Sequence, residues 1–244
     1  MLDIRCLTDY NILMTKRYQT EKQKRNSPSA PGECYHVYNR GVLKRDIFLD
    51  TKDYIRFLFL LLFHQSPTIT FINIGREVAH FVKHRMFNIS AREIKQINET
   101  KKVHLVAFTL MPNHFHLLLR EQDGAGISKY LQRLGNSYTK YFNTRYQQNG
   151  HLFQGRYQSV HVEDNDQLLY TSAYLHRNCV ELKGWRERGH LYPWSSYSDF
   201  IGNNRWDNLL EQGIIVEQFS DRKDYQRWVE ASGAKDEDKE LFLT

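Results

Sequence analysis

The sequence predicts an α+β domain, in which an antiparallel sheet has helices packed against it. Two observations predict this class. Short apolar segments typical of strands are interspersed with longer segments in which apolar residues recur every three or four positions. The 244 residues, 41% hydrophobic and 25% charged, are ordinary for a globular protein with a substantial core. One main domain with appendages is the simplest interpretation.

The expected elements follow one another in a single order. They are a strand at Tyr35–Arg40, a helix at Tyr54–His64, strands at Leu105–Met111 and His114–Arg120, a helix at Ile127–Tyr146, a strand at Arg156–Val162, and helices at Asp166–Asn178 and Tyr225–Ala231. The helix at Asp166–Asn178 follows an acidic, cap-like run that suits a helix N-terminus.

The chain divides into three zones. Residues 1–33 are polar and basic, with Lys22, Lys24 and Arg25, and are expected to form a flexible leader. Residues 34–202 hold the main domain. Residues 203–244 are expected to form a short helical appendage with an acidic, frayed end.

Composition favours certain partners and compartments. The net charge of +6 and the pI near 9.1 suit a polyanionic partner, although a basic enzyme without one fits the charge equally well. Aromatic content of 14% is more suggestive, because base stacking uses aromatic planes beside basic groups. Cys6, Cys34 and Cys179 lack paired zinc-ligand spacing and are expected to be free thiols in the cytoplasm. No apolar run is long enough to span a bilayer, and we expect no membrane association.

Two histidines flank one apolar residue within the apolar segment Met111–Leu119. Successive side chains of a strand point to opposite faces, so His114 and His116 share one face while Phe115 points to the other. Two imidazoles at this spacing offer two ligand positions for a metal ion. The alternative is a pair of hydrogen-bonded histidines on a half-buried strand, and the triplet alone does not decide between the two.

The expected helix Asp166–Asn178 carries phenols and a carboxamide on one stripe. Tyr170, Tyr174 and Asn178 stand at successive four-residue steps and therefore lie on the same helix face. The Asn178 oxygen is suited to complete a metal site begun by the two histidines, with positions left for water and a phosphate oxygen. Tyr170 is either a second helper phenol or a packing residue, and packing is the favoured interpretation.

Six short segments occur in the order in which one known family has them. They are Tyr35-His36-Val37-Tyr38-Asn39-Arg40-Gly41, Ile47-Phe48, Leu110-Met111-Pro112-Asn113-His114-Phe115-His116-Leu117-Leu118, Tyr138-Thr139-Lys140-Tyr141-Phe142-Asn143, Phe153-Gln154-Gly155-Arg156-Tyr157 and Tyr192-Pro193-Trp194-Ser195-Ser196-Tyr197. Together they resemble the single-tyrosine HUH nucleases, most closely the REP-associated tyrosine transposases, which are relatives of small insertion-sequence transposases. The likeness covers roughly residues 34–202.

The resemblance implies a ferredoxin-like antiparallel sheet, with the two histidines on a central strand and the tyrosine helix across it. It implies that Tyr174 is the catalytic nucleophile and that His114, His116 and Asn178 bind Mg²⁺ or Mn²⁺. The implied activity is cleavage and rejoining of single-stranded hairpin or palindromic DNA through a 5′-phosphotyrosine intermediate. Members of the family act as monomers or as homodimers with exchanged tyrosine helices, so both states stay open.

The chain departs from the family pattern in two places. It has Asn178-Cys179-Val180 where members usually have Asn-Pro-Val, so the helix end is less sharply defined by the sequence. The segment from Pro67 to Lys102 is longer than the usual link and is left unassigned.

Basic and aromatic residues suggest where DNA binds. The expected contacts are Arg40, Arg133, Tyr138, Lys140, Tyr141, Arg145, Arg156 and Tyr157. For those within Ile127–Tyr146, a solvated helix face is the alternative. His36 is expected either beside the metal, because its strand should neighbour the histidine strand, or as a core histidine.

Two rival functions remain open. The first is a binding protein that keeps the fold for hairpin DNA but has lost cleavage. The second is a metal-dependent hydrolase of a small phosphorylated molecule, with water as the nucleophile.

Overall fold

The computed structural model describes residues 29–69, 74–84 and 86–232. In this part of the chain, four strands form one antiparallel sheet: β1 (Cys34–Arg40), β2 (Val103–Met111), β3 (His114–Glu121) and β4 (Gln158–Val162). Their order is β2-β3-β1-β4. Helices follow the first and third strands, which gives the ferredoxin-like strand–helix–strand–strand–helix–strand arrangement. The expected α+β fold is therefore confirmed.

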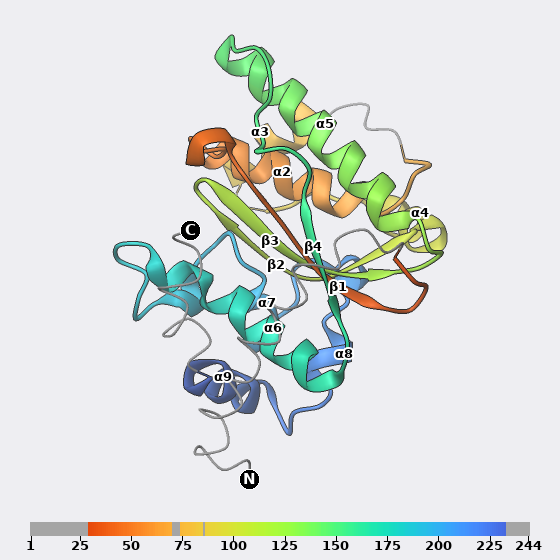
Figure 1. Ribbon diagram of the computed structural model, residues 1–244, viewed down its shortest axis with the longest axis vertical. Coiled ribbons are helices and arrows are strands. Elements are labelled where there is room, and N and C mark those ends of the chain that lie inside the picture. The colour runs from red at the N-terminus through yellow and green to blue at the C-terminus, as the bar shows by residue number, and fades with distance from the viewer. Residues whose placement is uncertain (1–28, 70–73, 85, 233–244) are drawn as a thin grey trace.

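Helices cover both faces of the sheet (Figure 1). On one face lie α2 (Thr51–Phe63) and α5 (Gly126–Tyr146), and the ring of Phe57 in α2 packs 5.2 Å from that of Phe115 in β3. On the other face lies α6 (Asn165–Arg177), with α7 (Tyr197–Ile201) and α9 (Arg222–Ala231) beside it. Shorter helical segments are η1 (Val42–Lys44), η2 (Asn178–Glu181), η3 (Gly189–Leu191), η4 (Asp207–Leu209) and α8 (Gly213–Val216).

The segment that the sequence left unassigned contains two helices, α3 (Ile74–His84) and α4 (Ala91–Thr100). Ser90 begins α4 with a capping box, in which its hydroxyl accepts from the Glu93 amide and the Glu93 carboxylate accepts from the Ser90 amide. Ile97 anchors α4 in the core, and α3 packs against α2. The long link is thus an added helical layer beside α2.

Acidic caps begin the helices that position the site. The Asp164 carboxylate accepts from the Gln167 amide at the start of α6. At the start of α5, the buried Glu121 carboxylate accepts from the amides of Gly126 and Ile127. Gly126 is required there, since a Cβ at this position would lie 2.2 Å from the Lys102 carbonyl oxygen.

The described part of the expected appendage, residues 203–232, packs into the main core. Trp206, Leu209, Tyr225 and Val229 are buried there with the sheet residues. The Tyr225 hydroxyl also lies 2.7 Å from Nδ1 of His176 in α6. Most of the expected leader, residues 1–28, and the acidic end, residues 233–244, fall outside the described residues. Among the described helices, none is both long and apolar enough to cross a bilayer.

Candidate active site

The two histidines lie where the sequence placed them, on one face of β3. His114 and His116 have ring centroids 5.1 Å apart with an interplanar angle of 88°. Phe115 between them points to the α2 face, where it contacts Phe57. His116 is 4% exposed, so the pair stands at the margin of the core beneath α6.

A hydrogen bond at Nδ1 orients each imidazole. Nδ1 of His114 lies 2.6 Å from Oδ1 of Asn113, and Nδ1 of His116 lies 2.8 Å from Nε2 of the buried His36. An amide oxygen only accepts, so His114 carries its proton on Nδ1 and its lone pair on Nε2. If His116 likewise donates to His36, both histidines present Nε2 as a ligand atom, which is the usual arrangement at metal sites.

A tight loop holds Asn113 in place. The Gly41 amide donates to the Asn113 carbonyl at 2.8 Å, and the Ile47 amide donates to the Pro112 carbonyl at 2.8 Å. A side chain at Gly41 would not fit, because its Cβ would lie 2.2 Å from the Arg45 carbonyl oxygen. The glycine that follows β1 therefore fixes the orientation of His114 through Asn113.

Helix α6 brings Tyr174 over the histidine strand. The ring centroid of Tyr174 lies 5.6 Å from that of His116 and 5.8 Å from that of His36, both edge-on. The hydroxyl of Thr109 in β2 donates to the Leu175 carbonyl at 2.7 Å and so fastens this turn of α6 to the sheet. Tyr174 is 5% exposed. The phenol and imidazole that were predicted to work together are therefore neighbours.

Asn178 ends the same stripe one turn beyond Tyr174. It is the C-cap of α6 in right-handed helical conformation, and its Nδ2 donates to the Tyr174 carbonyl at 2.9 Å. The expected blunting of the helix end at Cys179 takes the form of η2, which continues from Asn178. Oδ1 of Asn178 is buried and has no hydrogen-bond partner among the described residues. A buried acceptor without a donor is costly, which suits an atom reserved for a ligand.

The donor set fits one hard or borderline divalent ion. In the described part of the chain no three His, Cys, Asp or Glu side chains are arranged to hold a metal, so a site here must use the Asn178 amide oxygen. Two imidazole nitrogens and one amide oxygen accept Mn²⁺ or Mg²⁺. The residues present therefore agree with the metal set that the resemblance implies.

Two neighbours of this site were only partly foreseen. His36, weighed as either a site or a core residue, is both, since it is 1% exposed and bonded to His116. Tyr38 was missed. It lies opposite His116 in the sheet register, and its ring centroid is 5.6 Å from that of His116, as near as Tyr174. The signal was present, because Tyr38 is two residues from His36 and so shares its face. Tyr170, 7% exposed, packs in the core as favoured.

Four of the expected DNA contacts have structural roles instead. The prediction that Tyr138 offers a ring to DNA is wrong, because Tyr138 is 0% exposed and its hydroxyl donates to the Ile47 carbonyl at 2.6 Å. Arg145 forms ion pairs with Asp50 and Asp53, and the Tyr141 hydroxyl donates to Asp53. Burial raises the pKa of Asp50, but the adjoining Arg145 outweighs this and holds that pKa below its usual value.

Arg133 is the fourth. It is half-buried and donates to the His64 carbonyl at 2.7 Å. The remaining four expected contacts stay available to a ligand. Lys140, Arg156 and Tyr157 line a groove on the α5 side of the sheet, and Arg40 is exposed at the end of β1, where it donates to Gln154.

Comparisons with known proteins agree with these features. Residues 69–178 match the family model described as "Transposase IS200 like". No curated protein sequence matches the chain. A solved structure of a REP-associated tyrosine transposase bound to a REP hairpin is similar, with 13% sequence identity, a TM-score of 0.48, and coverage of 72% of this chain and 83% of that chain. The matched residues contain β3, α5 and α6, so the resemblance read from the motifs is confirmed and this chain carries an IS200-like transposase domain.

Proposed function

We propose that the protein is a single-stranded DNA endonuclease and strand transferase that acts on hairpin or palindromic DNA, with Tyr174 as the nucleophile. The observation that carries the proposal is the position of this phenol beside His116, with the unpartnered Asn178 oxygen one helical turn away. A phenol, two oriented imidazoles and a buried amide acceptor are more than a packed core requires. Together they match the groups needed for phosphoryl transfer to tyrosine.

The chemistry balances without a nucleotide cofactor. The Tyr174 oxygen forms a bond to the scissile phosphorus, and the bond from phosphorus to the 3′ oxygen breaks. The departing oxygen takes up a proton to become a 3′-hydroxyl, which balances the proton lost by the phenol. The other fragment stays joined to Tyr174 through its 5′ phosphate. Attack by a different 3′-hydroxyl reverses these steps and joins new ends, because the intermediate keeps the energy of the phosphodiester.

The surrounding residues orient this reaction. His114, His116 and Asn178 would hold one Mg²⁺ or Mn²⁺, whose contribution is to polarise a phosphate oxygen and so offset the poor nucleophilicity of a phenol with a pKa near 10. Asn113 and His36 keep the two imidazoles in the ligating tautomer through their bonds at Nδ1. The Thr109 hydroxyl keeps the Tyr174 turn against the sheet.

A covalent adduct tests the proposal. The probe is a pool of DNA hairpins with randomised single-stranded flanks and a fluorophore at the 3′ end, incubated with Mn²⁺ and separated under denaturing conditions. Because the protein stays on the 5′ phosphate of the labelled fragment, wild type should give a fluorescent protein band. Tyr174→Phe should give none while hairpin affinity stays within about threefold, since the ring still fills its space.

Two matched variants make the test specific. Tyr170→Phe removes a phenol from the same helix stripe, and Tyr38→Phe removes the phenol at the same ring distance from His116. Both should still form the adduct. An adduct that survives in Tyr174→Phe would overturn the assignment, and hairpin binding without any adduct in wild type would establish the non-catalytic binding protein instead.

A further inference from the structure

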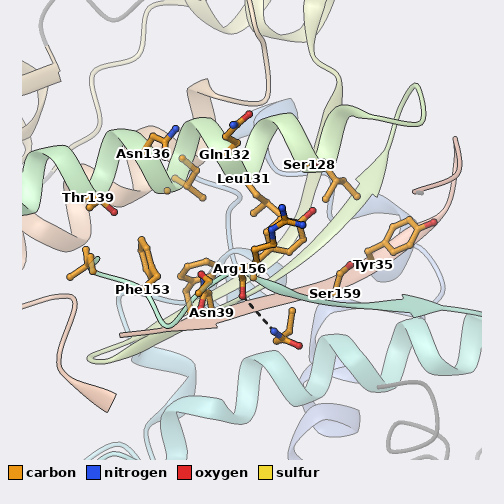
Figure 2. Close-up of a pocket in the computed structure, with 18 of the residues that line it drawn as sticks. Tyr35, Asn39, Ser128, Leu131, Gln132, Asn136, Thr139, Phe153, Arg156 and Ser159 are labelled. Carbon is orange, nitrogen blue, oxygen red and sulfur yellow. Dashed lines mark hydrogen bonds between the residues drawn. The ribbon is translucent and has the colours of Figure 1, made fainter. Parts of the chain in front are cut away.

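A large groove lies on the face of the sheet opposite the two histidines. It has a volume of about 1180 Å³ and runs between α5 on one side and β4 with its preceding segment on the other. Figure 2 shows Ser128, Leu131 and Thr139 of α5 across from Asn39 and Ser159, with Arg156 between the two walls. The groove exceeds the roughly 300–1,000 Å³ typical of small-molecule sites, which points to an extended ligand.

Strand alternation separates the groove from the candidate active site. Tyr35 and Asn39 of β1 and Phe115 of β3 line the groove, whereas Tyr38 and His116 belong to the other face. The groove is therefore a different surface from the Tyr174 site. Because β4 is the outermost strand, a ligand held in the groove can continue around that edge of the sheet.

The charges in the groove have one sign. Among its lining residues none is acidic, and Lys140 and Arg156 are both exposed. Within the described residues neither forms an ion pair or a side-chain hydrogen bond, in contrast to Arg145, which is held by two carboxylates. Two uncompensated cations facing a cavity without carboxylates create a positive potential, which favours a polyanion.

The uncharged lining suits unpaired bases. Ser128, Gln132, Asn136 and Lys140 stand at four-residue steps along α5 and form one wall. In the described structure the side chains of Gln132 and Asn136 make no hydrogen bond and are exposed, so their amides are available to base edges. The half-buried rings of Phe153 and Tyr157 lie on the other side, and such rings stack on bases regardless of sequence.

We propose that this groove binds the unpaired flank of the DNA hairpin, with phosphates at Lys140 and Arg156 and bases between the α5 amides and the two rings. The inference rests on the proposed function, since it assigns a holding surface for the strand that Tyr174 would cut. Recognition and cleavage would then use opposite faces of one sheet. The DNA strand would pass from one to the other around β4.

Salt-dependent binding tests the groove. The probe is a fluorescent hairpin with a single-stranded flank, titrated by anisotropy at several salt concentrations. Each phosphate contact on single-stranded DNA contributes about −0.7 to the slope of log affinity against log salt, so the double variant K140Q/R156Q should reduce the slope by about 1.4 and weaken binding on the order of tenfold or more. Gln132→Ala with Asn136→Ala should weaken binding without changing the slope.

Lys129→Gln is the matched control, because Lys129 is an exposed cation of α5 outside the groove. It should change affinity by less than about twofold, as expected for a lysine that contacts no phosphate. The inference is overturned if K140Q/R156Q binds as tightly as Lys129→Gln, or if a flankless duplex loses as much affinity as the flanked hairpin.

Adduct formation separates this outcome from failure of the proposed function. At saturating hairpin, K140Q/R156Q should still form the Tyr174 adduct, since the nucleophile lies on the other face. Wild type that forms no adduct but loses affinity on substitution of Lys140 and Arg156 would leave the groove standing and reject cleavage. An adduct in K140Q/R156Q with unchanged affinity would do the reverse.

Discussion

The two faces of the sheet use polar groups in opposite ways. On the α6 face, polar groups are buried and bonded to one another: His116 to His36, and Asn178 to the Tyr174 carbonyl. On the α5 face, Gln132 and Lys140 are exposed and, in the described structure, make no side-chain hydrogen bond to the protein. The comparison teaches that the first face is organised in advance for a reaction, whereas the second keeps its groups available for a ligand.

Both surfaces come from the same strands. In β1, His36 and Tyr38 point toward α6, while Tyr35 and Asn39 line the groove. A shift of one residue in the register of β1 would exchange the two sets. The accurate pairing of β1 with β3 therefore underlies both proposed functions.

The largest expected effect breaks the α6 face alone. His116→Ala removes one of three proposed ligands, so cleavage should fall more than about 100-fold and Mn²⁺ binding should be lost by calorimetry. Hairpin affinity should be retained because the groove is untouched. His151→Ala, an exposed histidine outside the proposed metal set, is the control. Unchanged Mn²⁺ affinity in His116→Ala would show that this histidine is structural.

The next effect sharpens the role of a positioning residue. His36→Ala removes the partner of Nδ1 of His116, so Mn²⁺ affinity should fall by roughly 10–100-fold, the usual cost of losing such a support. His36→Gln keeps an acceptor at this site and should recover part of that affinity. Equal Mn²⁺ affinities for wild type, alanine and glutamine variants would contradict the role.

A smaller effect tests the boundary of the groove face. Tyr138→Phe removes the hydrogen bond to Ile47, and stability measured by urea unfolding should fall by about 0.5–1.5 kcal/mol. Hairpin affinity should not change, since the ring lies in the core. A clear loss of DNA binding with unchanged stability would return Tyr138 to the DNA surface.

The smallest effect separates the pH dependence of the fold from that of the site. Burial raises the pKa of Glu211, but hydrogen bonds from His104 and Arg120 outweigh it and lower that pKa from 4.5 to about 2. The folded pKa is depressed, so this stabilisation is present above pH 4.5 and is lost as the pH falls through about 2. The difference in unfolding free energy between wild type and Glu211→Gln should shrink over that range. A difference that is constant with pH would contradict the assignment.

The sequence predicted the elements that periodicity controls. The histidine strand, the tyrosine helix and the stripe from Tyr170 to Asn178 were predictable, because two- and four-residue spacing decides which side chains share a face. Tyr138 was also within reach. It continues the apolar stripe of Leu131, Leu134 and Phe142 along α5, which marks it as buried.

The remainder depended on contacts between distant segments. The pairing of Arg145 with Asp50 and Asp53 joins α5 to the start of α2, and no local pattern signals it. The bond between His36 and His116 requires the register of β1 on β3. The groove arises where α5 stands apart from β4, a spacing that side-chain volumes across the whole core determine.

The identity of the linked residue tests the central claim most directly. The covalent complex formed with the 3′-labelled hairpin pool would be digested with protease and nuclease, and the modified peptide sequenced by mass spectrometry. The account predicts a nucleotide joined through its 5′ phosphate to Tyr174, and a free 3′-hydroxyl on the released fragment. Linkage to Tyr38, whose ring is equally near His116, or cleavage that leaves a free 5′ phosphate and no modified tyrosine, would contradict it.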